Sequence, residues 1–549
     1  MKKTHILTAT LVLGLMTACK EQLDVQNPNQ PTVASANTES GVIALAQGGV
    51  YVNGFREIKA ELYDGVPGYF WSGAMGLHSL MGDETGVEAA NWFMNQMACP
   101  DYVLLDAGTK VLNPTSPNQQ IVLIRQVNQN ANQGANPLFH EWWYMYSLNS
   151  AMNKILNLAE GAKFTGDAKA KKATLQAWAY WWKGYAYSRI GSIYYAGIIN
   201  DAPSGTNSNY VAKEKMIEAG NANFDKAAAL LSGLSGSADY TAVMDQLIPS
   251  MNKVGKGLVP TPDMWKRSIN TFKARNLLVN TRAKDMTAAG WNQLLTLTND
   301  GVKATDFVFT GRSNDNGDFL APLSGTVAAK ATGDPAGGAT YKISERLIQD
   351  FKPGDKRLAN NFAQRPSAWI GNSDRNNAFN TRWRLLDGGN KQPGVLTYSD
   401  RTAGATELYL AGTYEENELM KAEALLYTGK LDDGLKAIDA VRTAQGAGLA
   451  PVAGTGLSLD AAKEELRRER RSALAFRSLA FYDARRLGIL DDISKGGGRK
   501  DVVVIDATGK LNTKATINYN YLDYWDVPDN ELKNNPAASG SAPTQNPRQ

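Results

Sequence analysis

The chain has 549 residues, and its apolar fraction of 43% is that of a folded globular protein with a sizeable core. Its formal net charge is +4, and this falls to +2 if the first 18 residues are removed, because Lys2 and Lys3 lie there. A chain so close to neutral gives no reason to expect nucleic acid as a partner.

The N-terminal residues have the pattern of a secretion signal. Lys2 and Lys3 form a positive tip, and the segment from Ile6 to Ala18 is almost entirely apolar or small. The apolar run is shorter than the roughly 20 residues that a membrane-spanning helix needs. We therefore expect residues 1–18 to be a cleaved signal peptide rather than a permanent anchor.

The stretch LGLMTACKEQ resembles a bacterial lipobox, in which a peptidase cuts before the cysteine and the cysteine sulfur carries diacylglycerol. The resemblance implies that Cys19 is the lipid attachment point, and Lys20-Glu21 resembles a signal for the outer face of the cell. The alternative is an ordinary signal peptide with an incidental cysteine. In the lipidated form Cys99 is the only thiol left, so no internal disulfide is expected.

Residues 19–40 contain Pro28 and Pro31 among polar residues and lack a helical period, which predicts an extended tether. Beyond it, apolar residues recur every three or four positions over 138–159 and again over 175–193. This spacing predicts two amphipathic helices that form a hairpin.

Helical patterns return near the C-terminus. The sequence predicts helices over 414–427 and 431–441 with Gly429 between them, and a shorter helix around 269–281. It also predicts one long helix from about 460 to 487, because apolar residues there are seven positions apart. These are Leu466, Ala473, Ala480 and Leu487.

The segment 299–401 differs from its surroundings, since it is rich in Gly, Asn, Asp, Ser and Pro and has few periodic runs. It predicts loops with short strands such as 307–310, and 502–505 is a further predicted strand. The predicted fold is mainly α: tetratricopeptide-like helical hairpins form a scaffold over residues 41–298 and 402–549. This single domain carries residues 299–401 as a long, irregular, loop-rich insertion.

Catalytic and metal-binding motifs are missing from the sequence. His5, His78 and His140 are the only histidines, and neither an HExxH motif nor a cluster of Cys and His can be built from them. There is no G-x-S-x-G elbow and no phosphate-binding loop. We therefore predict no catalytic residue, no metal and no cofactor.

Aromatic side chains supply the candidate ligand-binding residues. Exposed rings can stack on the C–H face of a sugar, with neighbouring polar groups bonding to its hydroxyls. The alternative for any one ring is that it fills a gap between helices. The candidates are Tyr69, Trp71, Asp83, Trp92 and Phe93 in a glycine-rich region, and Trp383 and Arg384, together with Trp369, in the insertion.

The arginine-rich stretch 466–490 admits two interpretations. Its arginines could contact nucleic acid, or they could lie along packed helices and hold carboxylates such as Glu469 and Asp483. The apolar residues interleaved with the arginines favour the structural interpretation.

Taken in chain order, several segments resemble the SusD/RagB family of outer-membrane lipoproteins. The family pattern has a counterpart for each of LDVQNPNQPT, residues 142–158 followed by LQAWAYWWKGYAYSRIGSIY, FKPGDKRL, KAEALLYTGKLDDGLKAIDAVR, ERRSALAFRSLAFYDARRLGIL and YWDVPDNELKNNP. Two departures mark a divergent member. The family's E-G-x-R is Arg477-Ser478-Leu479-Ala480 here, and its R-Y-A-E is Thr413-Tyr414-Glu415-Glu416.

The resemblance implies a binding protein rather than an enzyme. Such a protein is anchored by lipid to the outer membrane, faces the cell surface and acts with a TonB-dependent barrel of the SusC type. It would bind an oligosaccharide or polysaccharide nutrient, or, as in RagB-like members, a peptide. A surface glycoside hydrolase is a further alternative, although the adjacent carboxylates Asp83-Glu84 and Glu415-Glu416 are unsuited to flanking one glycosidic bond.

Overall fold

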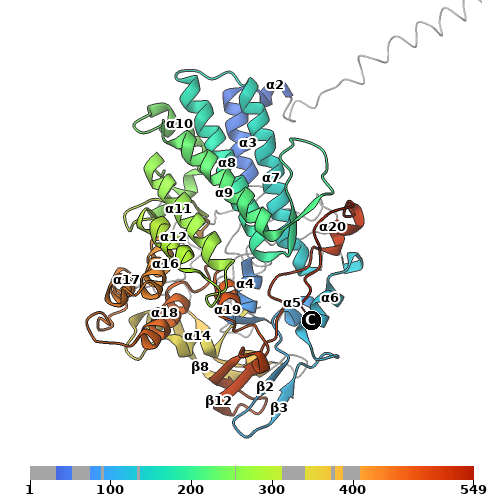
Figure 1. Cartoon of the computed structure of the whole chain (residues 1–549), viewed down its shortest axis with the longest axis vertical. Helices are drawn as coiled ribbons and strands as arrows, with labels where there is room; N and C mark the ends of the chain where they lie inside the picture. Colours follow the sequence, from blue (N-terminus) through green and yellow to red (C-terminus); the bar gives the residue numbers. More distant parts are fainter. Residues whose placement is uncertain are drawn as a thin grey trace, which may run out of the picture.

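The computed structural model describes residues 33–51, 75–87, 92–132, 136–253, 255–311, 341–371, 377–386 and 408–548, and the predicted mainly α fold is confirmed (Figure 1). Within these ranges no helix combines the length and the hydropathy that crossing a membrane requires. The helices are α2 (Val33–Ala36), α3 (Glu39–Tyr51), α4 (Met75–Met81), α5 (Trp92–Met97), α6 (Gln120–Val127), α7 (Pro137–Gly161), α8 (Ala168–Ile193), α9 (Lys213–Leu231), α10 (Ala238–Leu247), α11 (Pro262–Val279), α12 (Ala288–Asn299), α14 (Glu345–Asp350), α15 (Lys356–Asn361), α16 (Tyr414–Tyr427), α17 (Leu431–Ala444), α18 (Leu459–Ala473), α19 (Ala480–Arg486) and α20 (Asp529–Asn534).

The predicted hairpins are present. α7 and α8 form the first, and each begins at a capping side chain: Asn136 accepts a hydrogen bond from the backbone N–H of Leu138 at 3.1 Å, and Asp167 accepts one from Ala170 at 3.0 Å. Such caps contribute about 1 kcal/mol each. α16 and α17 form the second, with Gly429 in a left-handed conformation between them.

The tryptophans of α8 belong to the core. Trp178, Trp181 and Trp182 are fully buried, and their rings lie 5.3, 4.9 and 5.7 Å from the ring of Phe309. Aromatic pairs contribute about 0.5–1.5 kcal/mol beyond the burial of their area. The contacts therefore tie α8 to the segment that follows α12, and these three rings are not available to a ligand.

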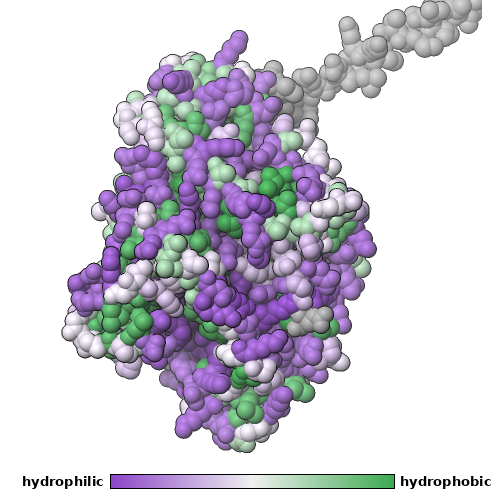
Figure 2. Space-filling view, in the orientation of Figure 1, coloured by the Kyte–Doolittle hydropathy of each residue, from purple (hydrophilic) through white to green (hydrophobic). Residues whose placement is uncertain are grey.

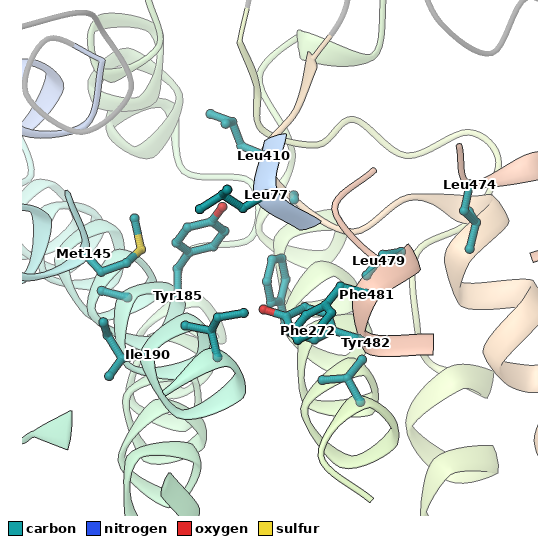
Figure 3. Packing of buried hydrophobic residues seen from close by; sticks show 14 of the residues in the cluster. Leu77, Met145, Tyr185, Ile190, Phe272, Leu410, Leu474, Leu479, Phe481 and Tyr482 are labelled. Carbon is teal, nitrogen blue, oxygen red and sulfur yellow. The ribbon is translucent and has the colours of Figure 1, made fainter. Parts of the chain in front are cut away.

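The same core joins helices that precede the insertion to a helix that follows it. Figure 3 shows Tyr185 of α8 and Phe272 of α11 facing Phe481 and Tyr482 of α19. The rings of Tyr185 and Phe272 are 5.6 Å apart. Scaffold parts that are separated in sequence by the insertion therefore share one hydrophobic core.

The prediction of one long helix over 460–487 is wrong. α18 ends at Ala473, and α19 begins at Ala480. Phe476 and Ser478, in the linker between them, each have a φ of +60°, which a right-handed helix cannot contain.

The structural interpretation of the arginine-rich stretch is confirmed. Arg470 donates two hydrogen bonds to Asp483, at 2.9 and 3.0 Å, and Arg486 donates two to Glu423, at 2.5 and 2.8 Å. All four side chains are buried.

Strands join distant parts of the chain. The largest sheet in the described residues has the order β11-β12-β2-β3, and its β12–β2 contact pairs Ile517 with Val103. The predicted strand 502–505 lies in β11, whereas the predicted strand 307–310 overlaps only the start of β6. The strands are β1 (Thr85–Val87), β2 (Tyr102–Leu104), β3 (Lys110–Leu112), β4 (Ala196–Ile198), β5 (Tyr210–Ala212), β6 (Thr310–Gly311), β7 (Tyr341–Ile343), β8 (Phe362–Trp369), β9 (Thr381–Leu385), β10 (Leu408–Tyr409), β11 (Arg499–Ile505) and β12 (Leu511–Asn518).

The described part of the insertion is more regular than predicted. It contains the short helices α14 and α15 and a hairpin formed by β8 and β9. Buried ion pairs attach it to the scaffold: Arg346 of α14 binds Asp83 at 2.7 Å, and Arg357 of α15 binds Glu469 of α18 at 2.5 Å.

Candidate functional site

Part of the predicted site can be located in the structure. Cys19, Tyr69 and Trp71 lie outside the described residues, and so does the side chain of Trp92 at the start of α5. Their roles stay predictions. Asp83, Phe93, Trp383 and Arg384 are described.

The structure brings the two predicted groups of residues close together. α5, which contains the half-buried Phe93, contacts β1, and β1 pairs with β7 through Thr85 and Ile343. β7 in turn contacts β9, which contains Trp383 and Arg384. The glycine-rich region and the insertion thus meet around the short β1–β7 sheet.

Asp83 lies inside this assembly rather than on its surface, with an exposed fraction of 3%. Its carboxylate accepts hydrogen bonds from Arg346 at 2.7 and 3.0 Å, from Ser344 at 2.9 Å and from Tyr519 at 2.6 Å. Burial alone would raise the pKa of Asp83, but Arg346, with Arg499 beyond it, more than offsets burial and holds the pKa well below its usual range. Both carboxylate oxygens accept hydrogen bonds from the protein itself, so the role of Asp83 is to hold the surrounding segments together rather than to contact a ligand.

The β8–β9 hairpin separates its candidate side chains onto two faces. In its register Trp369 is opposite Thr381 and Trp383 is opposite Gln364, with an irregularity in β8 between Gln364 and Trp369. Thr381 and Trp383 are two residues apart on β9, so the two indoles share the face of Thr381, which is fully buried. Arg384 is opposite Ala363 and therefore lies on the other face. A sugar ring stacked on Trp383 would not meet Arg384 on the same side of the hairpin.

Two basic residues near these rings were not predicted. The ammonium group of Lys342, on β7, lies 4.8 Å from the centre of the Trp369 ring, a cation–π contact. Arg365 donates a hydrogen bond from Nε to the carbonyl of Trp383 at 3.2 Å, and burial together with the charge of Arg384 lowers its pKa. The pairings cross between strands, so no local sequence pattern could have indicated them.

His78 is buried on α4, which contacts β1, and it is paired within the protein. Nε2 of His78 lies 2.9 Å from a carboxylate oxygen of Glu141, whose other oxygen accepts a hydrogen bond from Nε of Arg189 at 2.6 Å. Burial lowers the pKa of His78, and Glu141 offsets only part of this. Among the described residues, no group of three His, Cys, Asp or Glu side chains is placed to hold a metal ion.

Comparisons with known proteins agree on one family. Its model, described as the SusD family, matches residues 294–547. Two solved structures resemble the chain over most of its length: a SusD-like carbohydrate binding protein from Bacteroides vulgatus (14% identity, TM-score 0.54, covering 92% of this chain and 98% of that one) and NanU from B. fragilis (13%, 0.55, 95% and 100%).

A third similar structure contains a xylogluco-oligosaccharide (14% identity, TM-score 0.51, covering 92% of this chain and 99% of that one). At these identities the three structures establish the fold. No curated protein matches the chain.

Proposed function

The chain belongs to the SusD family, and on that premise we propose that it binds oligosaccharide or polysaccharide nutrients at the cell surface. In this proposal Cys19 is the lipid anchor in the outer membrane. The bound glycan is passed to a TonB-dependent transporter of the SusC type, which supplies the energy for uptake. The protein itself breaks no bond.

The observation that carries the proposal is the shared face of Trp369 and Trp383 on the β8–β9 hairpin, in a fold like that of a carbohydrate binding protein. An indole presents a flat apolar surface on which the C–H face of a pyranose can stack. Trp383 is half-buried: it packs against the core and its indole N–H is buried, so only the remaining part of its ring is open to a ligand. Asp83 and Arg346 beneath the assembly hold β1 and α14 in place, so the platform is formed before the ligand arrives.

Calorimetric titration of the purified full-length chain tests the proposal. The probes are maltoheptaose, a xyloglucan oligosaccharide and a mixed set of peptides. We expect binding of at least one glycan and a loss of about 1–3 kcal/mol in Trp383→Ala, by analogy with other aromatic stacking platforms. Arg384→Ala, on the opposite face, should change the affinity less.

Leu112→Ala serves as the control, because this leucine is 49% exposed on β3, a strand that pairs with β2 and not with the β8–β9 hairpin. Binding of peptides but of no glycan would support the RagB-like alternative instead. Release of shorter sugars from the glycan would show a hydrolase and contradict the proposal.

A further inference from the structure

A second concave surface lies between α3 and α7. This α3–α7 groove has a volume of about 510 Å³, within the range of small-molecule sites. Figure 1 places α3 and α7 in the upper half of the molecule and β8 in the lower half, so the groove is separate from the hairpin site. Its walls include Leu45 and Gly49 of α3, Phe139, Trp143 and Tyr146 of α7, and Glu531 of α20.

The two helices approach closely along the groove. A Cβ atom at Gly49 would lie 2.9 Å from the Cε of Met152 and 3.1 Å from the Cβ of Ala151, so the absence of a side chain permits this packing. Leu45, one turn earlier on α3, is 39% exposed. In Figure 2 hydrophobic atoms gather where Figure 1 labels α7.

The α7 wall is an aromatic surface, and hydrogen bonds fix the orientation of one of its rings, Tyr146. Phe139, Trp143 and Tyr146 follow one another at intervals of four and three residues, so they lie on one face of the helix, and all three are half-buried. The hydroxyl of Tyr146 donates to the carbonyl of Ile198 at 3.0 Å and accepts from its N–H at 2.6 Å. Its ring also packs 4.7 Å from that of Trp142 beneath it.

Polar groups border the same surface. Ser147, Ser150 and Lys154 continue along α7 and supply hydroxyl and ammonium donors. Across the groove, one carboxylate oxygen of Glu531 accepts from the indole N–H of Trp142 at 3.2 Å, and the other accepts from Asn535 at 3.0 Å. Each oxygen keeps a further lone pair for a ligand hydroxyl.

From this arrangement we propose that the α3–α7 groove is a second carbohydrate-binding site, which takes pyranose rings of a neutral glycan. Rigid aromatic faces match the C–H face of such a ring, and fixed donors and acceptors on both sides match its hydroxyls. If the groove only contacted a flat apolar surface of another protein, a carboxylate such as Glu531, held in place by two hydrogen bonds, would serve no purpose there. The proposal rests on the proposed function for its ligand class, but it concerns a different site.

Two sites on one chain favour long ligands. Once a polysaccharide occupies one site, its second contact is intramolecular and gains from a high effective concentration. An oligosaccharide too short to reach both sites gains nothing from this. The groove is thus expected to matter most for polymeric glycans.

The test compares groove and hairpin variants of the purified full-length chain in binding to xyloglucan polymer and to its short oligosaccharides. Trp143→Ala removes the stacking surface, and Ser150→Trp fills the groove from an exposed position without deleting a packing contact. Asn292→Trp adds the same ring at an exposed position of α12, a helix that contributes nothing to the groove, and is the matched control. Thermal unfolding of each variant verifies that it is folded.

We expect both groove variants to weaken polymer binding by about 5- to 100-fold, by analogy with the stacking of one nucleic-acid base on an aromatic ring, while Asn292→Trp binds normally. If Ser150→Trp and Trp143→Ala bind the polymer normally and Trp383→Ala does not, the groove proposal is overturned and the proposed function stands. If the groove variants bind the polymer normally but, when isolated from cells, no longer copurify with a membrane barrel, the groove is a protein contact, and the proposal is again overturned. A wild-type chain that binds none of the glycans would overturn the proposed function itself.

Discussion

Asp83 and Glu84 are neighbours in the sequence, but the protein shifts the pKa values of their carboxyl groups in opposite directions. The ion pair with Arg346 holds the pKa of Asp83 low, as described above. Burial raises the pKa of Glu84 to about 7, and the charge of Arg471 offsets only part of this. Glu84 instead accepts a hydrogen bond from the backbone N–H of Phe476 at 3.1 Å, in the linker between α18 and α19.

The raised pKa of Glu84 predicts a pH dependence of stability. Because protonation is favoured in the folded state, the contribution of Glu84 is present below its unfolded pKa of about 4.3 and is lost as the pH rises toward 7. Compared with Glu84→Gln, the wild type should lose up to about 3 kcal/mol of unfolding free energy between pH 5 and pH 8, at about 1.4 kcal/mol per pKa unit. Urea titrations at the two pH values measure this difference. If the unfolding free energies of the wild type and of Glu84→Gln change equally between the two pH values, the prediction is contradicted.

Ser478 occupies the place of the glycine in the family's E-G-x-R motif, and its φ of +60° is one that glycine adopts without strain. We expect Ser478→Gly to stabilise the protein by up to about 1 kcal/mol, since a left-handed residue costs about 1–2 kcal/mol and glycine adds about 0.5–1 kcal/mol of backbone entropy. Chemical denaturation measures the change. Ser150→Gly, inside α7, is the control and should destabilise by about 0.5 kcal/mol. A destabilised Ser478→Gly would show that the serine side chain matters more than the backbone.

At the scale of elements, the pairing of α8 with α9 depends on two glycines that face each other. A Cβ at Gly220 would lie 2.5 Å from Oγ of Ser188, and one at Gly184 would lie 2.7 Å from the ring of Phe224. The two helices therefore pack with backbone against backbone.

Gly220→Ala should force the two helices apart. Overpacking costs about 1–3 kcal/mol, and the higher helix propensity of alanine returns about 1 kcal/mol of this. We expect a net loss of unfolding free energy, measured by thermal and urea unfolding. Gly161→Ala, where a Cβ would meet no atom within 4 Å, is the control and should be neutral or stabilising. Equal stability of the two variants would contradict this account of α8 and α9.

Helices with a local signal could be predicted from the sequence, as α7, α8, α16 and α17 demonstrate. The break between α18 and α19 could not be predicted, because a seven-residue spacing of apolar side chains continues across it, at Leu466, Ala473, Ala480 and Leu487. All but Leu487 are buried in the native packing, so the pattern reports burial correctly but not the backbone path. Likewise, nothing local pairs β2 with β12, since that register depends on residues about 400 positions apart.

The candidate site was predictable in composition but not in geometry. The aromatic residues of the insertion could be selected from the sequence, and Trp383 does share a face with Trp369. That Arg384 lies on the other face follows from strand alternation, which requires knowing that 381–385 is a strand. The burial of Asp83 depends on Arg346 and Tyr519, which come from distant segments.

At the scale of the whole molecule, the proposed function requires attachment to the membrane through Cys19. We expect Cys19→Ser to move the protein from the membrane fraction to the soluble fraction and to abolish growth on the bound glycan. The affinity of the purified chain for that glycan should not change. Cys99→Ser, a buried position near β2, is the control and should stay at the membrane. Retention of Cys19→Ser in the membrane fraction would exclude the lipid anchor.

The buried ion pairs between insertion and scaffold have a consequence for how the chain melts. Separating Arg357 from Glu469, or Arg346 from Asp83, would leave the buried carboxylate with one basic partner fewer, since Glu469 would keep Arg442 and Asp83 would keep Arg499. The cost of each separation is therefore at most about 3–5 kcal/mol. Neither part can then unfold alone, and calorimetry should record one cooperative transition. A sugar bound at the hairpin or at the α3–α7 groove would raise that single melting temperature in the same way. A thermal-shift screen can therefore find a ligand for this protein, but only the variants can locate it.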